Sequence, residues 1–404
     1  MVKFSQTEAS AAAARHEMLY AGREGGVAAF FANIDLSGLS LAGRNLSDVD
    51  FSGAKLEETD LSGARLDGAK FTDAILRRTN LTGALLRGAI LRGASLRGAN
   101  LIGANLTDAD LREESAAPAE LTGAILVSAD LTRVRLEGAL AIQADFSDAL
   151  MDGCTLAGAN LREANFESAS LDAADLSGST LAGADFTDAV LTGVHLDGAD
   201  LGGTVFASAL TDAPAGKGWL SGETATSAID LHTQWIETGG RQGKPADFSG
   251  YDLRRLTVSP GSILNGLIAP HAILSGLDLS RLRLTGADFA GADLRRVKFT
   301  GADLRGADFS GAKLSFANFR DARIGPLMIA GGRLLPARFD GATVRKVDFR
   351  GSDLNRARFA GCDLSGTDFA GASLRDTDLA DVDLTGAKLA VSRFYNPPTT
   401  NKIG

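Results

Sequence analysis

The side chains that most often carry chemistry are few in this sequence, and they lie far apart along it. Four histidines occur: His16, His195, His232 and His271. None of them lies at metal-ligand spacing from another histidine or from a cysteine. The sequence contains neither a nucleophile elbow nor a phosphate-binding loop. We therefore predict no catalytic residue, no metal site and no cofactor, and we interpret the protein as a non-enzyme.

Aspartates are abundant, but they recur at a fixed position of a five-residue repeat. At such a position the carboxylate accepts bonds from nearby backbone amides, which indicates a solvated face. A calcium site would need several converging oxygens, and the glycine-rich nonapeptide of calcium-binding β-rolls is absent. One column of carboxylates is expected along one side of the second half: Asp288, Asp308, Asp348 and Asp368. The opposite side is expected to carry Lys298, Arg338 and Arg358.

Charge is unevenly distributed along the chain. Residues 36–210 contain 13 Lys/Arg and 25 Asp/Glu, a net charge of −12, whereas residues 246–394 contain 21 and 17, a net charge of +4. Within 136–206, Arg162 is the one basic residue against 12 acidic residues, a net charge of −11. A basic belt precedes this segment: Arg77, Arg78, Arg87, Arg92 and Arg97. Segregated charge steers partners, so we interpret Arg77, Arg87, Arg92, Arg97 and the aspartate column as the candidate partner surface.

These charges are positioned by a repeat of five residues, in which leucine or phenylalanine recurs and alanine usually stands two residues earlier. Five residues of helix turn the chain by roughly 500°, so such positions spread around the helix. In a straight strand an odd step changes the face each time. The pattern is satisfied if the chain turns a corner after every short extended segment, with the corners at the pairs that contain glycine.

The phenylalanines indicate how many corners make one coil. Spacings of 20 residues in the first half, and of ten in the second, predict a four-sided coil of 20 residues. The phenylalanines of the first half then stack on single sides, and those of the second half stack on two opposite sides. Because Phe146 follows Phe71 by fifteen repeats, which is not a whole number of four-sided coils, we expect the first stack to move by one side. The predicted core ladder is Phe31, Phe51, Phe71, Phe146, Phe166, Phe186, Phe206, Phe289, Phe299, Phe309, Phe319, Phe339, Phe349, Phe359 and Phe369.

This pattern resembles the pentapeptide-repeat family, whose repeat is Ala-(Asp/Asn)-Leu-X-X. The resemblance covers residues 31–210 and 246–396 and implies an all-β fold, the right-handed quadrilateral β-helix. Glu113 to Pro118 interrupt the repeat without changing its phase, and we interpret them as a corner loop pushed outward or a functional protrusion.

Two short helices are expected to cap these solenoids. Ser5 with Glu8 matches a capping box that starts a helix over 5–21, and a second helix is expected over 226–238. The motif from His232 and Trp235 to Phe248 is similar to the N-terminal cap of the family. The predicted organisation is a cap helix (1–30), a first solenoid (31–210), a linker with a cap helix (211–245), a second solenoid (246–396) and a tail (397–404).

Function is less constrained than fold. We interpret the protein as a non-catalytic scaffold that presents charged and apolar patches to an unknown protein partner. The resemblance implies two alternatives: a DNA mimic that modulates a type II topoisomerase and protects gyrase, and a secretion-system effector or accessory protein. Direct nucleic-acid binding is not expected, because the positive excess of the second solenoid is small and the aromatics are buried.

The sequence also bears on location and assembly. No run of 18 apolar residues and no signal peptide is found, so we expect no membrane partner and a cytoplasmic location in a bacterium, with secretion by another route left open. The last coil, around Leu384, Leu389 and Phe394, needs cover from the tail or from a second copy in a C-terminal homodimer.

Overall fold

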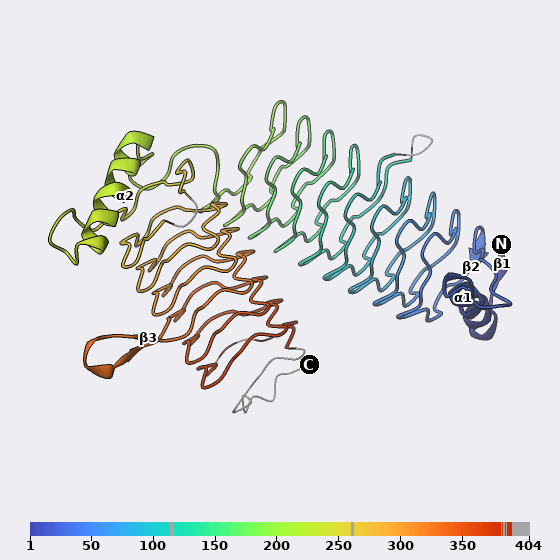
Figure 1. The fold of residues 1–404 in the computed structure, drawn as a ribbon. Helices are drawn as coiled ribbons and strands as arrows, with labels where there is room; N and C mark the ends of the chain where they lie inside the picture. Colours follow the sequence, from blue (N-terminus) through green and yellow to red (C-terminus); the bar gives the residue numbers. More distant parts are fainter. Residues whose placement is uncertain (114–116, 260–261, 381, 383, 385, 390–404) are drawn as a thin grey trace. The chain divides into compact units, whose positions relative to one another are not determined.

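A computed structural model describes residues 1–113, 117–259, 262–380, 382, 384 and 386–389. The chain divides into two compact units, residues 1–212 and 213–404, which we describe separately. Each unit is a stack of rectangular coils (Figure 1). The named elements are few, because most strand segments are single bridges: β1 (Val2–Lys3), α1 (Gln6–Tyr20), β2 (Ile34–Asp35), α2 (Gly222–Glu237), β3 (Leu327–Met328), the 3₁₀ turn η1 (Ala330–Gly332) and β4 (Leu334–Leu335).

Each five-residue repeat forms one side of a coil and pairs in parallel with the fourth repeat after it, as Asp50 does with Lys70. The Phe51 amide donates to the Lys70 carbonyl at 2.7 Å, and the Lys70 amide donates to the Val49 carbonyl at 3.0 Å. The chain turns at the second residue after each leucine or phenylalanine, where φ is positive, as at Gly63 (62°) and Asp73 (55°). The predicted right-handed quadrilateral β-helix is therefore confirmed.

The core of the first unit consists of inward-pointing ladders of leucine, alanine and phenylalanine. Phe51 and Phe71 stack at 4.9 Å between ring centroids, and Phe166 and Phe186 stack at 4.6 Å. Phe206 stacks on Phe186 at 5.4 Å but is 36% exposed. Phe206 is thus part of the ladder, as predicted, but it is partly exposed because it belongs to the last coil of the repeat.

One coil of the first unit is longer than the others. Ser95 pairs with Glu120 and Asp110 with Arg135, so each of these residues pairs with the fifth repeat after it instead of the fourth. The extra repeat keeps the phase but rotates every later residue by one side. Consequently Phe146 lies on the side opposite to Phe71, two sides away, and our expectation of one side was wrong. Residues 114–116 of this interruption, including Glu114, lie outside the described residues.

We name the four sides of the first unit after the core residues of its first coil: the Phe31, Leu36, Leu41 and Leu46 sides. Phe31, Phe51 and Phe71 stack on the Phe31 side. Pairing places a second set on the Leu41 side: Leu41, Leu61, Leu81, Leu101, Leu126, Phe146, Phe166, Phe186 and Phe206. These two sides are opposite each other.

The second unit has phenylalanine ladders on two opposite sides, as predicted. Phe289, Phe309, Phe339 and Phe359 form one ladder, and Phe299, Phe319, Phe349 and Phe369 form the other. Rings of the two ladders meet edge to face, for example Phe309 and Phe319 at 5.6 Å. Such contacts are favourable because the positive ring edge meets the negative ring face.

A hairpin leaves the second unit between two repeats, and it is the orange projection in Figure 1. Leu327 pairs with Leu335 and Met328 with Leu334 in antiparallel register. Asp308 accordingly pairs with Arg338, which lies six repeats later instead of four, so the hairpin adds the length of two repeats to one coil. This addition keeps the phase of the repeat and rotates all later residues by two sides.

Local capping motifs determine where the two capping helices begin. The Ser5 hydroxyl accepts from the Glu8 amide at 3.3 Å, and the Glu8 carboxylate accepts from the Ser5 amide at 2.8 Å, which confirms the capping box. Helix α2 begins at Gly222, four residues before the predicted start, because the Ser221 hydroxyl accepts from the Thr224 amide at 3.1 Å. Of the described helices, neither is long and apolar enough to cross a bilayer.

Both caps use a histidine in the same way. The Ala29 amide donates to Nδ1 of His16 at 3.2 Å, and the Ala246 amide donates to Nδ1 of His232 at 3.0 Å. Each alanine stands two residues before the first core phenylalanine of its unit, Phe31 or Phe248. Each histidine thus fastens its helix to the first side of the coil below it.

Candidate interaction surfaces

Carboxylates gather on the Leu41 side of the first unit. We name Asp145, Asp148, Glu167, Asp185 and Asp188 the acidic side. Within residues 124–206, this side carries no lysine or arginine. These carboxylates share one side because they recur on regular coils of four repeats after the insertion, and the Phe146 ladder lies beneath them.

The carboxylates that end each strand segment are held by the backbone. The Ser147 amide donates to Asp145 at 3.0 Å, and the Thr187 amide donates to Asp185 at 2.8 Å. Asn165 lies between them in the column and donates from its side-chain amide to Asp145 at 3.1 Å. These bonds fix the direction of the carboxylates without neutralising their charge. The acidic side is thus a rigid array of negative charge on neighbouring coils, spaced about 4.8 Å apart.

Two more aspartates extend this negative charge onto the adjoining Leu46 side. Asp152 accepts from the Ser170 hydroxyl at 2.7 Å, and Asp172 accepts from the Thr192 hydroxyl. Both residues are half-buried and stand directly after a core residue. The negative surface therefore turns a corner of the coil.

The predicted basic belt is not a free positive surface. Its ion pairs join residues on different coils: Arg78–Glu58 at 2.8 Å, Arg87–Asp67 at 3.1 Å, Arg92–Asp110 at 2.7 Å and Arg97–Glu120 at 3.7 Å. Arg77 instead donates to the Ser95 hydroxyl at 3.3 Å. Arg77 and Arg97 lie on the Leu36 side, Arg87 on the Leu46 side and Arg92 on the Phe31 side. The belt spans three sides of the coil, and four of its five charges are matched by a carboxylate.

The most strongly paired carboxylate lies beside the long coil. Asp110 is 3% exposed and accepts from Arg92 at 2.7 Å, from Arg112 at 2.9 Å and from Arg135 at 2.9 Å. Burial by itself raises the pKa of Asp110, but the bonds from Arg112 and Arg92 outweigh burial and lower the pKa to about 2. This cluster joins three successive coils across the insertion, so we assign it a structural role.

The expected aspartate column of the second unit is wrong. Asp288 pairs with Asp308, but the next residues along that column are Arg338 and Arg358. Asp348 and Asp368 stand on the opposite side, in the column that contains Lys298. The hairpin causes this exchange, because it rotates residues after it by two sides. Each column therefore mixes signs, as in the Arg338–Asp308 pair at 3.4 Å, and the predicted segregation of charge is absent from these columns.

The hairpin itself was missed by the sequence reasoning, since it preserves the five-residue phase. It exposes Met328 (72%), Leu334 (42%) and Leu335 (36%), whereas core leucines are buried. Its base lies over the coil at Gly306, where the Leu327 Cβ is 2.7 Å from the position of an added side-chain carbon. Leu327, Met328 and Leu335 lie between Pro326 and Pro336 but outside the positions of the repeat that leucine or phenylalanine fills, and they are the signal that could have found it.

Among the residues that the structure describes, no three His, Cys, Asp or Glu side chains converge in an arrangement that could hold a metal ion. Both cysteines are buried, and burial raises the pKa of the Cys362 thiol to about 11. Residues after Leu389 lie outside the description, so the C-terminal homodimer stays a prediction.

Comparison with known proteins agrees with this architecture. The sequence pattern described as "Pentapeptide repeats" matches residues 34–73, 45–83, 79–113, 129–167, 169–206, 271–301, 289–324, 337–369 and 352–390, together more than half of the chain. None of the curated proteins matches the sequence significantly.

Several solved structures are also similar to the chain, over shares of its length that range from 26% to 92%. One from the thylakoid lumen of Arabidopsis thaliana is 35% identical over 26% of this chain and 69% of its own, with a TM-score of 0.24. HetL, involved in heterocyst differentiation regulation in Nostoc sp. strain PCC 7120, is 20% identical over 92% and 94%, with a TM-score of 0.17. QnrB1, a plasmid-mediated fluoroquinolone resistance protein, is 19% identical over 45% and 86%, with a TM-score of 0.21. From its repeats, its four-sided coils and the match to the repeat pattern, the chain belongs to the pentapeptide-repeat family.

Proposed function

We propose that the protein is a non-catalytic scaffold that binds other proteins, and that the acidic side of the first unit is its main binding surface. The observation that carries the proposal is the alignment of Asp145, Asp148, Glu167, Asp185 and Asp188 on one side of three successive coils. The repeats determine shape, and the outward positions are free to determine what the surface attracts.

The physical argument concerns the net charge of this side. Elsewhere on the first unit, carboxylates pair with arginines on neighbouring coils, as Asp67 does with Arg87. The acidic side carries no lysine or arginine within residues 124–206, so its net charge is negative. Carboxylates two coils apart are separated by about 10 Å, comparable to the Debye length of about 8 Å at physiological ionic strength. Their fields overlap, so the side attracts a partner with a complementary basic surface.

Affinity capture from the native cell tests this proposal with two matched variants of the full chain. The first carries Asp145→Asn, Glu167→Gln and Asp185→Asn, which remove three charges while the Asn oxygens still accept the backbone bonds. The control removes three aspartates that also cap backbone amides but lie on other sides: Asp50→Asn, Asp175→Asn and Asp200→Asn.

We expect the wild-type protein and the control to retain the same partner, and the acidic-side variant to lose it. Retention should also fall as salt is raised. A partner retained equally by all three proteins would contradict the assignment of the acidic side. Turnover of a metabolite by the protein, without any stable partner, would contradict the scaffold itself.

A second candidate, a DNA mimic that modulates a type II topoisomerase, is favoured by the same acidic side. QnrB1 is a fluoroquinolone resistance protein, but its similarity to this chain is too low to carry the argument. The mimic requires negative charge along the surface, and the net charge of −11 over residues 136–206 provides it. The ion-paired arginines of the basic belt do not add to this negative charge. Nor do the columns of the second unit, in which both signs of charge occur.

A gyrase supercoiling assay separates the two candidates. A DNA mimic inhibits supercoiling or protects the enzyme from a quinolone, and the acidic-side variant loses this effect whereas the control retains it. Absence of both effects at micromolar wild-type protein would remove the mimic and leave the scaffold.

A further inference from the structure

The first coil of the first unit has four strand edges, and the cap satisfies three of them. On the Leu36 side, β1 pairs with β2, and the Phe4 amide donates to the Asp35 carbonyl at 3.0 Å. On the Leu41 side, the Gln6 side-chain amide takes the place of a strand. Its oxygen accepts from the Ser40 amide, and its nitrogen donates to the Ser40 carbonyl, both at 2.8 Å.

The Leu46 side is also engaged by the cap. The Asn45 amide donates to the Glu17 carboxylate at 3.0 Å, and Arg44 forms an ion pair with the same carboxylate at 2.7 Å. Helix α1 therefore supplies hydrogen-bonding groups where no preceding coil exists. Without such partners, the first coil would present open edges that other chains could pair with.

The fourth edge, on the Phe31 side, is left open. The coil below binds this segment through the Phe31 amide, which donates to the Asp50 carbonyl at 2.9 Å. In a parallel ladder the amide and carbonyl of Phe30 itself then point to the other neighbour. Among the described residues, neither group has a hydrogen-bond partner, and the Phe30 side chain is 67% exposed.

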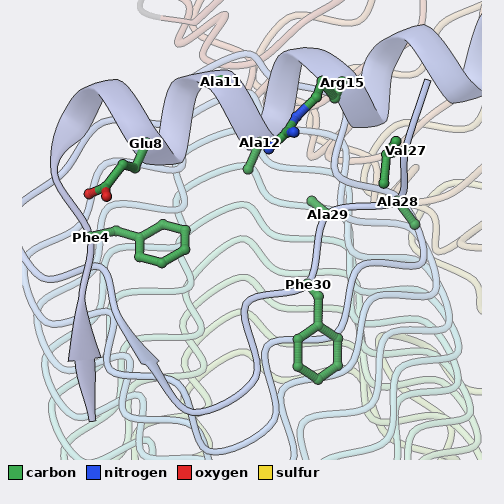
Figure 2. A pocket seen from close by; sticks show the side chains of 9 residues that line it. All are labelled: Phe4, Glu8, Ala11, Ala12, Arg15, Val27, Ala28, Ala29 and Phe30. Atoms are coloured by element: carbon green, nitrogen blue, oxygen red, sulfur yellow. The ribbon is translucent and has the colours of Figure 1, made fainter. Parts of the chain in front are cut away.

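A groove of about 350 Å³ borders this open edge (Figure 2). Helix α1 forms one wall through Ala12 and Arg15, and the segment from Val27 to Phe30 forms the other. Phe4 closes one end and packs edge to face on Phe31 at 6.1 Å. The interior is therefore apolar, and one wall is a strand edge with unused donor and acceptor groups.

The formal charges of the groove balance, but within the described residues its positive group is not ion-paired. Two ionised side chains line it, Glu8 and Arg15. The Glu8 carboxylate is engaged by the Ser5 amide and hydroxyl, each at 2.8 Å, in the capping box. No ion pair with Arg15 is present among the described residues, and its side chain is directed toward the groove in Figure 2. A negatively charged group on the occupant complements this guanidinium.

We propose that this groove binds an extended acidic segment of a partner protein, which adds to the Phe30 edge as a parallel strand. Its backbone carbonyl accepts from the Phe30 amide, and its backbone amide donates to the Phe30 carbonyl. Side chains of a strand alternate in direction, so apolar residues face Phe4 and Ala12 while a carboxylate reaches Arg15. The site is distinct from the acidic side, and it selects a partner of the opposite charge.

The test uses the full chain and three labelled probe peptides of eight residues. One alternates aspartate with valine, the second lysine with valine, and the third aspartate with serine. Fluorescence anisotropy should show binding of the aspartate–valine peptide and at least about tenfold weaker binding of the other two, because each lacks one of the two recognised features.

Two substitutions locate the site. Arg15→Glu should weaken binding of the aspartate–valine peptide by at least about tenfold and improve binding of the lysine–valine peptide. Phe30→Pro removes the donor of the open edge and should abolish binding, whereas Phe30→Ser keeps the backbone groups and should reduce binding by about fivefold. Unchanged far-UV circular dichroism of each variant shows that the chain as a whole is still folded.

Equal affinity of the wild-type protein and the Arg15→Glu and Phe30→Pro variants would overturn the proposal. Equal binding of the acidic and basic peptides would overturn it as well. Light scattering at the assay concentration tests a second copy as occupant: a dimer that Phe30→Pro dissociates would replace the acidic partner by self-association. Failure of the acidic-side variants in affinity capture would not affect these outcomes, because none of them changes the groove.

Discussion

Truncation of one phenylalanine in the middle of a ladder, compared with truncation of its equivalent at the end, tests how the first unit is stabilised. Phe166 is fully buried and stacks on Phe146 at 5.0 Å and on Phe186 at 4.6 Å. Phe206 belongs to the same ladder, but it has one stacking neighbour and is 36% exposed. The two substitutions to alanine remove the same atoms from different surroundings.

We expect Phe166→Ala to lower the free energy of unfolding by about 4 kcal/mol, the middle of the range for a buried phenylalanine. Phe206→Ala should lower the free energy of unfolding by about 2 kcal/mol, because part of the ring is already in water and its removal leaves no closed cavity. Loss of two stacking contacts adds to the first value and loss of one adds to the second.

Urea unfolding measures both values. Far-UV circular dichroism follows both units, whereas the only tryptophans, Trp219 and Trp235, report on the second unit. Both substitutions should therefore shift the dichroism transition of the first unit and leave the tryptophan transition in place. Equal losses from Phe166→Ala and Phe206→Ala would refute the ladder as described, since burial and stacking would then not determine stability.

Three further predictions concern the hairpin of the second unit and two ionisable groups, Asp110 and His232. Deletion of residues 326–335 removes the hairpin and restores the usual four-repeat spacing between Asp308 and Arg338. We therefore expect unchanged far-UV circular dichroism and weaker binding of an apolar dye, because the exposed side chains of Met328, Leu334 and Leu335 are removed. An unfolded product would contradict this. Asp110 has a lowered pKa, so its stabilisation of about 2 kcal/mol is present above pH 4 and lost as the pH falls toward 2. The stability difference between wild type and Asp110→Asn should shrink over that range, and a constant difference would count against the arginine cluster. Burial lowers the pKa of His232, so the second unit should lose stability as the pH falls below about 6.5, and tryptophan fluorescence should show this loss in wild type but not in His232→Gln.

The sequence is sufficient to predict the fold because the repeat is strict. Leucine or phenylalanine at every fifth position, with alanine two residues earlier, allows one arrangement in which both point inward. The regular spacing of Phe146, Phe166 and Phe186, four repeats apart, then indicates the number of sides. The helix that begins at Gln6 is predictable from Ser5 and Glu8, since the capping box is a local motif.

The surfaces are less predictable, and the two insertions explain why. Insertions of one and two repeat lengths leave the phase unchanged, so the spacing of the core residues does not show the rotation of later residues around the coil. For this reason the expected column from Asp288 to Asp368 is divided between two opposite sides. The carboxylates of the acidic side all follow the first insertion at regular spacing, so the insertions do not divide them.

Tertiary contacts determine the remaining features. The neutralisation of Arg87 by Asp67 depends on pairing between coils, and the sequence alone does not state which coils are neighbours. The open edge at Phe30 follows from what the cap covers, and Gln6 acts there as a substitute strand through its side chain. A side chain that replaces a strand has no signature in a repeat pattern.

Every surface described above depends on which residues are neighbours in successive coils, and disulfide cross-linking measures this most directly. Asn100 pairs with Ile125 across the long coil, so Asn100→Cys with Ile125→Cys places two sulfur atoms within bonding reach, because paired strands lie about 4.8 Å apart. Asn100→Cys with Glu120→Cys keeps the usual spacing of four repeats but places the two cysteines on different sides. In a background without the native cysteines, mild oxidation should link the first pair and not the second. A link in the second pair and none in the first would contradict the rotation of the coil, and with it the assignment of the Phe146 ladder to the Leu41 side.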